Sequence, residues 1–185
     1  MNLQGSECSA TDTFHALVLF PRLICMKLVK LLSPEQIVAD LEAIEHWGAI
    51  TELVDRLVNC GLLAACEREA TLEALRAREQ LVSTGIGGGV AIPHAFSDEL
   101  EKVVAVLGRS KAGIDFEAVD QAPVHVIVLF VVPRKNYQLH LKMLAAIAKM
   151  FNGQDMSRRI LGANGCDEIL AILGSKSSRV EPPAS

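Results

Sequence analysis

A glycine-rich segment that ends in a histidine, residues 83–94, is the part of the chain best suited to chemistry. Four of its residues are glycine, so the backbone there can bend sharply and approach a bound group closely. The apolar run at 90–92 predicts a short strand, which Pro93 ends because proline fixes φ and lacks a backbone N–H. We therefore expect the ring of His94 at the mouth of a hollow lined by N–H donors, a place suited to an anion.

A histidine in this setting is suited to accepting a phosphoryl group. Such transfer needs a neutral imidazole with one ring nitrogen free to attack, and donors that spread the charge of the transferring group. With an ordinary pKa of about 6.5, His94 would be mostly neutral at the pH of a cell. Alternatively, His94 simply ends a strand. The residues that would cradle the phosphoryl oxygens are Ser83, Thr84, Gly85, Gly87, Gly88 and Gly89.

Two more residues, His140 and Arg78, could complete such a site. His140 lies near the start of a helix predicted at 137–152, where the positive end of the helix dipole favours an anion. There it can donate a hydrogen bond to a phosphoryl oxygen or hold the tautomer of His94. Arg78 ends the helix before the glycine segment, and its guanidinium can bind two oxygens at once. The alternatives are a surface histidine, and a surface arginine paired with a neighbouring glutamate such as Glu79.

The other histidines suggest less. We expect His125, at the start of a strongly apolar segment, to be a hydrogen-bonded residue at a strand end. His46 precedes a helix and has no reactive neighbour in the sequence. A metal-dependent hydrolase built on His94 and His140 is a distant alternative, but the two lie far apart in the chain and no third ligand is evident. We therefore expect no metal, and no cofactor either, since the chain has no P-loop pattern.

The apolar patterns place these residues in an α/β fold. The strongest strand signal, residues 124–132, is apolar almost throughout, which indicates a central strand covered on both faces. Period-2 alternation predicts a strand at 36–43, whereas helical spacing predicts a helix that ends at Gly61. We expect a single domain with one mixed β-sheet flanked by helices on both faces. The other predicted elements are strands at 90–92 and 103–107, a turn at 113–116, and helices at 67–80, 137–152, 154–162 and 166–173.

Composition excludes several classes of protein. The 185 residues carry a net charge of −4 and only 4% aromatic residues, which argues against a nucleic-acid surface. No apolar stretch is long enough for membrane insertion, and five cysteines without a Cys-x-x-Cys pair indicate free thiols in the cytoplasm. We interpret residues 1–25 as a leader of low order or a misassigned start, 26–173 as the domain, and 174–185 as a disordered tail.

The residues that suggest this chemistry also resemble a known family. Residues 83–95 are similar to the active-site signature of the enzyme IIA domain of the fructose–mannitol class of the bacterial phosphotransferase system, which includes the nitrogen-regulatory IIA proteins. Arg78 and Glu79 precede the signature at the family's spacing. The segment 123–133 resembles the family's central strand, and His140 with its apolar neighbours resembles the segment of its second active-site histidine. The likeness covers the whole predicted domain.

This resemblance implies a fold and a role for each residue. The family fold is a mixed sheet flanked by helices, with a first strand at 37–43 and a first helix at 47–59. His94 would be the transiently phosphorylated residue, His140 would support the phosphoryl group, and Arg78 would lie near it. The donor would be a small phosphohistidine carrier of the HPr type.

The family contains two kinds of protein, and we expect the regulatory kind. A nitrogen-type IIA protein ends the relay and modulates target proteins, whereas a sugar-specific IIA component passes phosphate to a IIB domain during fructose- or mannitol-class uptake. We expect no attached IIB or membrane IIC region, and residues 26–33 resemble the start of a regulatory protein. Two features depart from the family: His125 stands where an acidic or polar residue is usual, and residues 1–25 have no counterpart.

Overall fold

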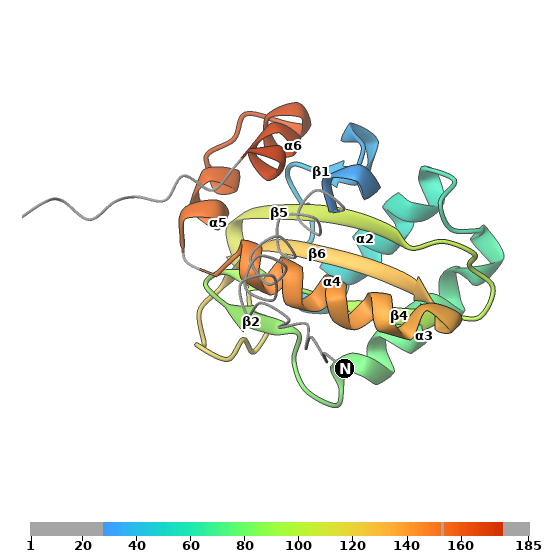
Figure 1. Ribbon diagram of the computed structural model, residues 1–185. Helices are drawn as coiled ribbons and strands as arrows, with labels where there is room; N and C mark the ends of the chain where they lie inside the picture. Colours follow the sequence, from blue (N-terminus) through green and yellow to red (C-terminus); the bar gives the residue numbers. More distant parts are fainter. Residues whose placement is uncertain (1–27, 153, 176–185) are drawn as a thin grey trace, which may run out of the picture.

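A mixed β-sheet forms the centre of the computed structural model, which describes residues 28–152 and 154–175 (Figure 1). Its strands are β1 (Ile37–Val38), β2 (Gly85–Gly87), β3 (Val90–Ala91), β4 (His94–Ser97), β5 (Val104–Ile114) and β6 (Val124–Pro133). They are ordered β1-β5-β6-β3-β2, and β4 also pairs with β6. β5 runs antiparallel to β6, whereas β3 and β4 run parallel to it. The predicted mixed sheet is confirmed. The predicted leader and the tail beyond residue 175 lie outside the described residues.

Helices cover both faces of this sheet. In Figure 1, α4 (Tyr137–Met150) crosses in front of the strands, and α2 (His46–Asn59) passes behind them. The others are α3 (Arg68–Glu79), α5 (Gln154–Leu161) and α6 (Cys166–Gly174), with 3-10 turns at Pro34–Gln36, Ala65–Glu67 and Arg134–Asn136. These helices agree with the sequence prediction to within a few residues. Within the described part of the chain, no helix is long and apolar enough to cross a membrane.

Strand β6 is apolar along almost its whole length because it supplies both cores. Successive side chains of a strand point to opposite faces, and here each face is covered by helices. Val126, Val128, Phe130 and Val132 pack in the core with α4, α5 and α6. Ile127, Leu129 and Val131 pack in the core with α2 and α3.

Pro93 interrupts the chain beside β6 without ending the pairing. β3 pairs with Val126 and Ile127 of β6, and β4 pairs with residues 130–133 farther along the same side. Pro93 has no N–H to donate, but its carbonyl accepts a hydrogen bond of 3.1 Å from the backbone N–H of Phe130. The short strand predicted at 90–92 therefore does end before Pro93, as β3, whereas β4, whose four residues pair along β6 beginning with His94, was not predicted.

Two strands differ from their predicted bounds, and one buried side chain explains both. Arg109 of β5 is only 1% exposed, and it donates to the backbone carbonyl of Ala39. The chain therefore leaves the sheet after Val38, and the strand predicted at 36–43 has only two residues. β5 in turn continues through Arg109 to Ile114, past the predicted end at 107 and into the predicted turn, after an irregular register.

We predict that Arg109→Met lowers the free energy of unfolding by about 2–4 kcal/mol, because it leaves buried carbonyls without a donor. The carbonyls concerned belong to Ala39 and Ala163, whereas that of Ile160 keeps a hydrogen bond from the N–H of Ala163. Urea denaturation measures the change. Lys111→Met is the matched control, since Lys111 also lies on β5 and pairs with Asp40 but is exposed. Equal stability of the two variants would contradict the prediction.

Candidate active site around His94

His94 begins β4 and lies almost entirely inside the protein, with 5% of its surface exposed. Its Nδ1 is 2.8 Å from the carbonyl oxygen of Ile92. A carbonyl can only accept a hydrogen bond, so we assign the ring proton to Nδ1. Nε2 of the neutral ring then carries a lone pair, which can act as a nucleophile or as a base.

The side chain of Arg78 covers this nitrogen. Arg78 lies in the last turn of α3, where its Nε donates to Nε2 of His94 at 3.0 Å and its Nη1 donates to the carbonyl of Val82 at 2.8 Å. The sequence suggested a ring open at the mouth of a hollow. The ring is instead buried beneath a half-buried guanidinium, so a reacting group must displace Arg78 from Nε2.

The ring of His140, from the first part of α4, lies beside that of His94. The two ring centres are 4.7 Å apart. His140 is 7% exposed, and neither of its ring nitrogens has a hydrogen-bond partner among the described residues. Phe96 and Tyr137 pack around it, with ring centres 4.8 and 6.0 Å away. Because buried polar atoms are nearly always paired, two unpaired ring nitrogens indicate a place for a polar ligand.

Both histidines are held neutral by their surroundings. Burial is the main cause that lowers the pKa of His94 to about 4. The charges of Arg78 and His140 act in the same direction, whereas the hydrogen bond to Ile92 and the charge of Glu79 oppose it. Burial, and then the charge of Arg78, also lowers the pKa of His140. At neutral pH the site therefore combines a fixed positive charge with two uncharged imidazoles, which suits an anion and leaves Nε2 of His94 nucleophilic.

The turn made by Gly87, Gly88 and Gly89 does not reach this site. All three glycines have positive φ, between 63° and 87°, and they close the tight turn between β2 and β3. Val90, at the start of β3, pairs with Val126 of β6, whereas His94 pairs with Phe130. These two positions of β6 are four residues apart, which separates the turn from His94 by about 13 Å along the strand. The N–H of Gly88 is bound to the carboxylate of Asp120 at 2.8 Å. The prediction that these three glycines cradle a group on His94 is therefore corrected.

The rest of the predicted cradle lies closer to the histidine. The carbonyl of Thr84 accepts a hydrogen bond of 3.0 Å from the N–H of Ile92, two residues before His94. Thr84 is 4% exposed, and its hydroxyl has no hydrogen-bond partner among the described residues. The N–H of Gly85 donates to the hydroxyl of Ser83 at 3.1 Å, which fixes the local backbone. Thr84 is therefore the member of the predicted cradle that the backbone ties directly to the segment before His94.

Sequence reasoning missed a buried acid beside the site, Glu79. The carboxylate of Glu79 accepts a hydrogen bond of 2.8 Å from the N–H of Thr84 and lies 3.3 Å from Nε2 of His46. Two interpretations were thus wrong: Glu79 does not pair with Arg78, and His46 does have a charged neighbour. The helical period could have revealed the acid, because Glu79 follows the buried Leu75 by four residues and lies on the same face of α3.

The structure also bears on His125 and on the metal-dependent hydrolase considered above. His125 lies at the start of β6, where its Nδ1 is 3.0 Å from the carbonyl of Ser110, as expected for a hydrogen-bonded strand-end residue. Among residues 28–152 and 154–175, no group of three or more His, Cys, Asp and Glu side chains could hold a metal ion. His94 and His140 therefore have no third ligand in this part of the chain.

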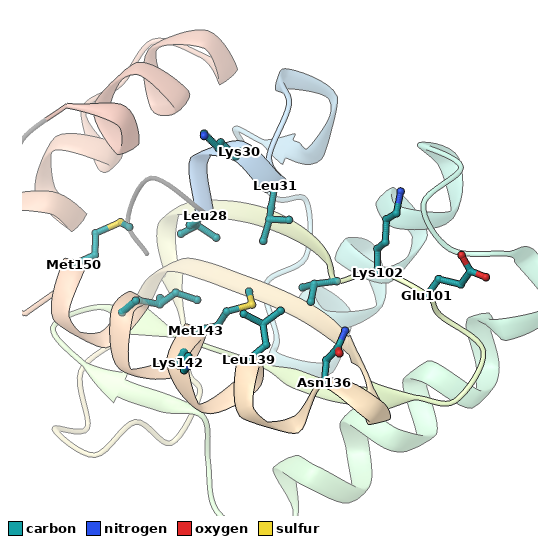
Figure 2. Close-up of a pocket in the computed structure, with 13 residues that line it drawn as sticks. Leu28, Lys30, Leu31, Glu101, Lys102, Asn136, Leu139, Lys142, Met143 and Met150 are labelled. Atoms are coloured by element: carbon teal, nitrogen blue, oxygen red, sulfur yellow. The ribbon is translucent and has the colours of Figure 1, made fainter. Parts of the chain in front are cut away.

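An apolar cavity lies apart from these residues. Figure 2 shows an apolar cavity of about 430 Å³ between the helical turn at 28–31 and α4, with Leu28, Leu31, Leu139 and Met143 among its lining residues. None of its lining residues is His94, Arg78 or His140. The candidate site is thus defined by converging polar side chains, and not by this apolar cavity.

Comparison with known proteins identifies the family. A family model described as "Phosphoenolpyruvate-dependent sugar phosphotransferase system, EIIA 2" matches residues 30–176. The chain therefore belongs to this family of EIIA domains, as its glycine–histidine segment suggested.

Individual relatives carry both kinds of name found in the family. The nitrogen regulatory protein of Bradyrhizobium diazoefficiens is 32% identical over 148 residues, which are 80% of this chain and 95% of the relative. The fructose-specific EIIABC component of Bacillus subtilis is also 32% identical over 148 residues, but the chain spans only 23% of it. The crystal structure of nitrogen regulatory protein IIA-Ntr from Neisseria meningitidis is similar with a TM-score of 0.72 and 29% identity, over 79% of this chain and 98% of that one.

The lowered pKa of His94 predicts that the protein loses stability as the pH falls from about 6.5 to about 4. In this window the unfolded chain binds a proton on His94 and the folded protein does not, so unfolding becomes easier. The loss due to this residue is about 3 kcal/mol. Urea denaturation at several pH values should therefore show a flatter pH dependence for His94→Asn than for the wild type. Parallel pH profiles would count against the prediction.

Proposed function

We propose that this protein is a phosphocarrier that accepts a phosphoryl group from an HPr-type protein onto Nε2 of His94. One observation carries the proposal: a buried neutral imidazole directs its unprotonated nitrogen at a guanidinium, beside a second histidine whose ring nitrogens are unpaired. Membership of the EIIA family supports the phosphotransferase role. The tautomer of His94 supports Nε2 as the attacking atom.

The transfer exchanges one nitrogen–phosphorus bond for another. The lone pair on Nε2 of His94 attacks the phosphorus of the donor's phosphohistidine, and the donor imidazole leaves with the electron pair of the broken bond. Nδ1 keeps its proton and its hydrogen bond to Ile92 throughout. Bonds of the same kind are broken and formed, so the protein mainly has to align the groups and stabilise charge.

Arg78 and His140 would supply that charge stabilisation. In the unphosphorylated protein Nε of Arg78 occupies the position in front of Nε2, so the guanidinium must exchange the ring nitrogen for a phosphoryl oxygen. His140 gives up no hydrogen bond when it donates to another oxygen, because its ring nitrogens are unpaired among the described residues. The hydroxyl of Thr84 would be a third donor. Each of these contacts would favour the phosphorylated form.

Exposed apolar side chains around the site suit a protein as the phosphoryl donor. Leu81 and Val82 follow the helix of Arg78, and Tyr137 and Leu141 flank His140 on α4; all four are more than half exposed. Large exposed apolar side chains that cluster around a polar site are typical of a protein-docking surface. We therefore infer that the donor binds across the ends of α3 and α4.

We propose a regulatory role for the phosphorylated protein in the cytoplasm. Similarity to the nitrogen regulatory protein of Bradyrhizobium diazoefficiens and to the structure of IIA-Ntr supports this role, while fructose-specific relatives of similar identity support the alternative. In this role the charge added at His94 would alter binding to a target protein. Transfer to a IIB domain during sugar uptake is the alternative, and rapid loss of phosphate to a purified fructose-class IIB domain would favour it.

We predict that the protein incubated with enzyme I, an HPr-type carrier and phosphoenolpyruvate gains an acid-labile phosphate on Nε2 of His94. His94→Ala should abolish labelling. His140→Ala should lower the transfer rate about 10- to 100-fold, since a hydrogen bond to a charged group contributes about 1.5–3 kcal/mol. Radiolabelling measures the rate, and phosphorus–nitrogen NMR identifies the ring atom.

His125→Ala is the control for this experiment, because His125 lies on the sheet far from His94 and should label like the wild type. Full labelling of the His94→Ala protein would exclude the assigned site. Phosphate on Nδ1 would exclude the proposed tautomer.

The docking surface generates a separate prediction. Leu141→Glu should raise the carrier concentration at half-maximal rate about 10-fold and leave the maximal rate unchanged, because it adds charge to an apolar contact. Val119→Glu is the control, since Val119 is even more exposed than Leu141 but precedes β6, at the end of the sheet away from His94. A lower maximal rate with unchanged half-saturation would contradict a docking role for Leu141.

A further inference from the structure

Two adjacent residues at the end of α3 direct their side chains to different places. Arg78 reaches the ring of His94, whereas the side chain of Glu79 is only 4% exposed and lies inside the protein. The proposed transfer makes no use of this buried carboxylate. A buried charge is costly unless it is paired, so its partners indicate what it does.

The carboxylate of Glu79 joins three separate parts of the fold. Oε1 accepts the 2.8 Å hydrogen bond from the N–H of Thr84, in the segment before β2. The same oxygen lies 3.3 Å from Nε2 of His46, the first residue of α2. The ring of His46 is itself held by Phe116 and Trp47, with ring centres 4.0 and 4.9 Å away. Glu79 therefore connects α2, α3 and the segment that leads to the site.

These contacts keep the acid ionised although it is buried. Burial by itself would raise the pKa of the Glu79 carboxyl, but the interactions with His46 and Thr84 outweigh it and hold the pKa below its ordinary value. The resulting negative charge acts on His94 in the opposite sense to Arg78. Glu79 thus affects the site through charge as well as through geometry.

Glu79 and Arg78 hold the same turn, residues 80–84, from its two sides. Nη1 of Arg78 binds the carbonyl of Val82, and the carboxylate of Glu79 binds the N–H of Thr84. If Glu79 is removed, the N–H of Thr84 loses its partner. In the described part of the chain, this end of the turn is then held only by the bonds of Ser83 to Phe116 and of Thr84 to Ile92. Any shift there moves the carbonyl of Val82, which orients the guanidinium. The position of Arg78 over Nε2 therefore depends on a residue that does not touch His94.

We propose that Glu79, which lies against His46, is a positioning residue for phosphoryl transfer: it fixes the turn at 80–84 and so keeps the guanidinium of Arg78 beside His94, where it can pass from Nε2 to a phosphoryl oxygen. This inference rests on the proposed function. Replacing Glu79 should lower the rate of transfer and leave the binding of the donor unchanged, because neither Glu79 nor His46 lies among the exposed residues of the docking surface.

The test compares Glu79→Gln and Glu79→Ala with Glu73→Gln, an exposed carboxylate on the same helix. Glu79→Ala should lower the maximal rate of labelling by HPr-type carrier about 100-fold, because the guanidinium is misplaced. Glu79→Gln can still accept the hydrogen bond from Thr84 and should show a smaller loss. The carrier concentration at half-maximal rate should change less than about twofold, and Glu73→Gln should match the wild type.

A second readout does not need the phosphoryl donor. Hydrogen exchange of the Nε–H of Arg78, followed by NMR in the unphosphorylated protein, should be slow in the wild type and at least about 10-fold faster in Glu79→Ala. Unchanged exchange together with an unchanged rate would overturn the inference. A different outcome would separate the two proposals. If exchange is slow in the wild type and fast in Glu79→Ala, but His94 is never labelled, the proposed function is overturned while the positioning of Arg78 by Glu79 stands.

His46→Phe tests the other half of the pair, since phenylalanine keeps the ring contacts and removes the nitrogen that faces the carboxylate. If His46 acts through Glu79, the single change lowers the maximal rate, and adding it to Glu79→Ala causes no further loss. Independent, additive losses would show that His46 does not act through Glu79.

Discussion

The hydrogen bond between Nδ1 of His94 and the carbonyl of Ile92 is the interaction on which the site depends. A neutral imidazole in water exchanges between two tautomers, but this carbonyl accepts a hydrogen bond only from a protonated Nδ1, which leaves the lone pair on Nε2. Burial strengthens the choice, because it disfavours the charged ring that carries protons on both nitrogens. Pro93 takes part indirectly, since its own carbonyl binds β6 and holds the backbone between the two groups.

The sheet explains why three distant residues meet at this ring. In the described part of the chain β4 pairs with β6 alone, so it is an edge strand that helices can approach from both faces. α3 belongs to the core on one face and delivers Arg78, while α4 belongs to the core on the other face and delivers His140. Phe130 of β6 stacks against His94 from within the sheet. The ring of His94 is thus enclosed by all three layers of the fold.

Much of the architecture could be predicted from local patterns. The apolar run of β6 and the helical periods of α2, α3 and α4 are strong signals, because burial on one or both faces dictates residue type directly. The prediction failed where a single polar side chain changed the local outcome. Arg109 is a charged residue, which the sequence alone would place at the surface. It is instead buried and bound to carbonyls that are far away in the chain, so it shortens β1 and extends β5. Glu79 is similarly buried, and it faces His46 instead of the neighbouring Arg78 that local sequence offered as a partner.

The sequence by itself determined the class of fold, the family and the histidine at the centre of the site, because these depend on short motifs and on the spacing of apolar residues. Only the tertiary structure decided that the glycine turn lies away from His94, that Arg78 covers the ring, and that Glu79 faces His46. The physical reason is that hydrogen bonds and burial act between atoms close in space. Which atoms those are depends on strand register and helix packing, which no short stretch of sequence specifies.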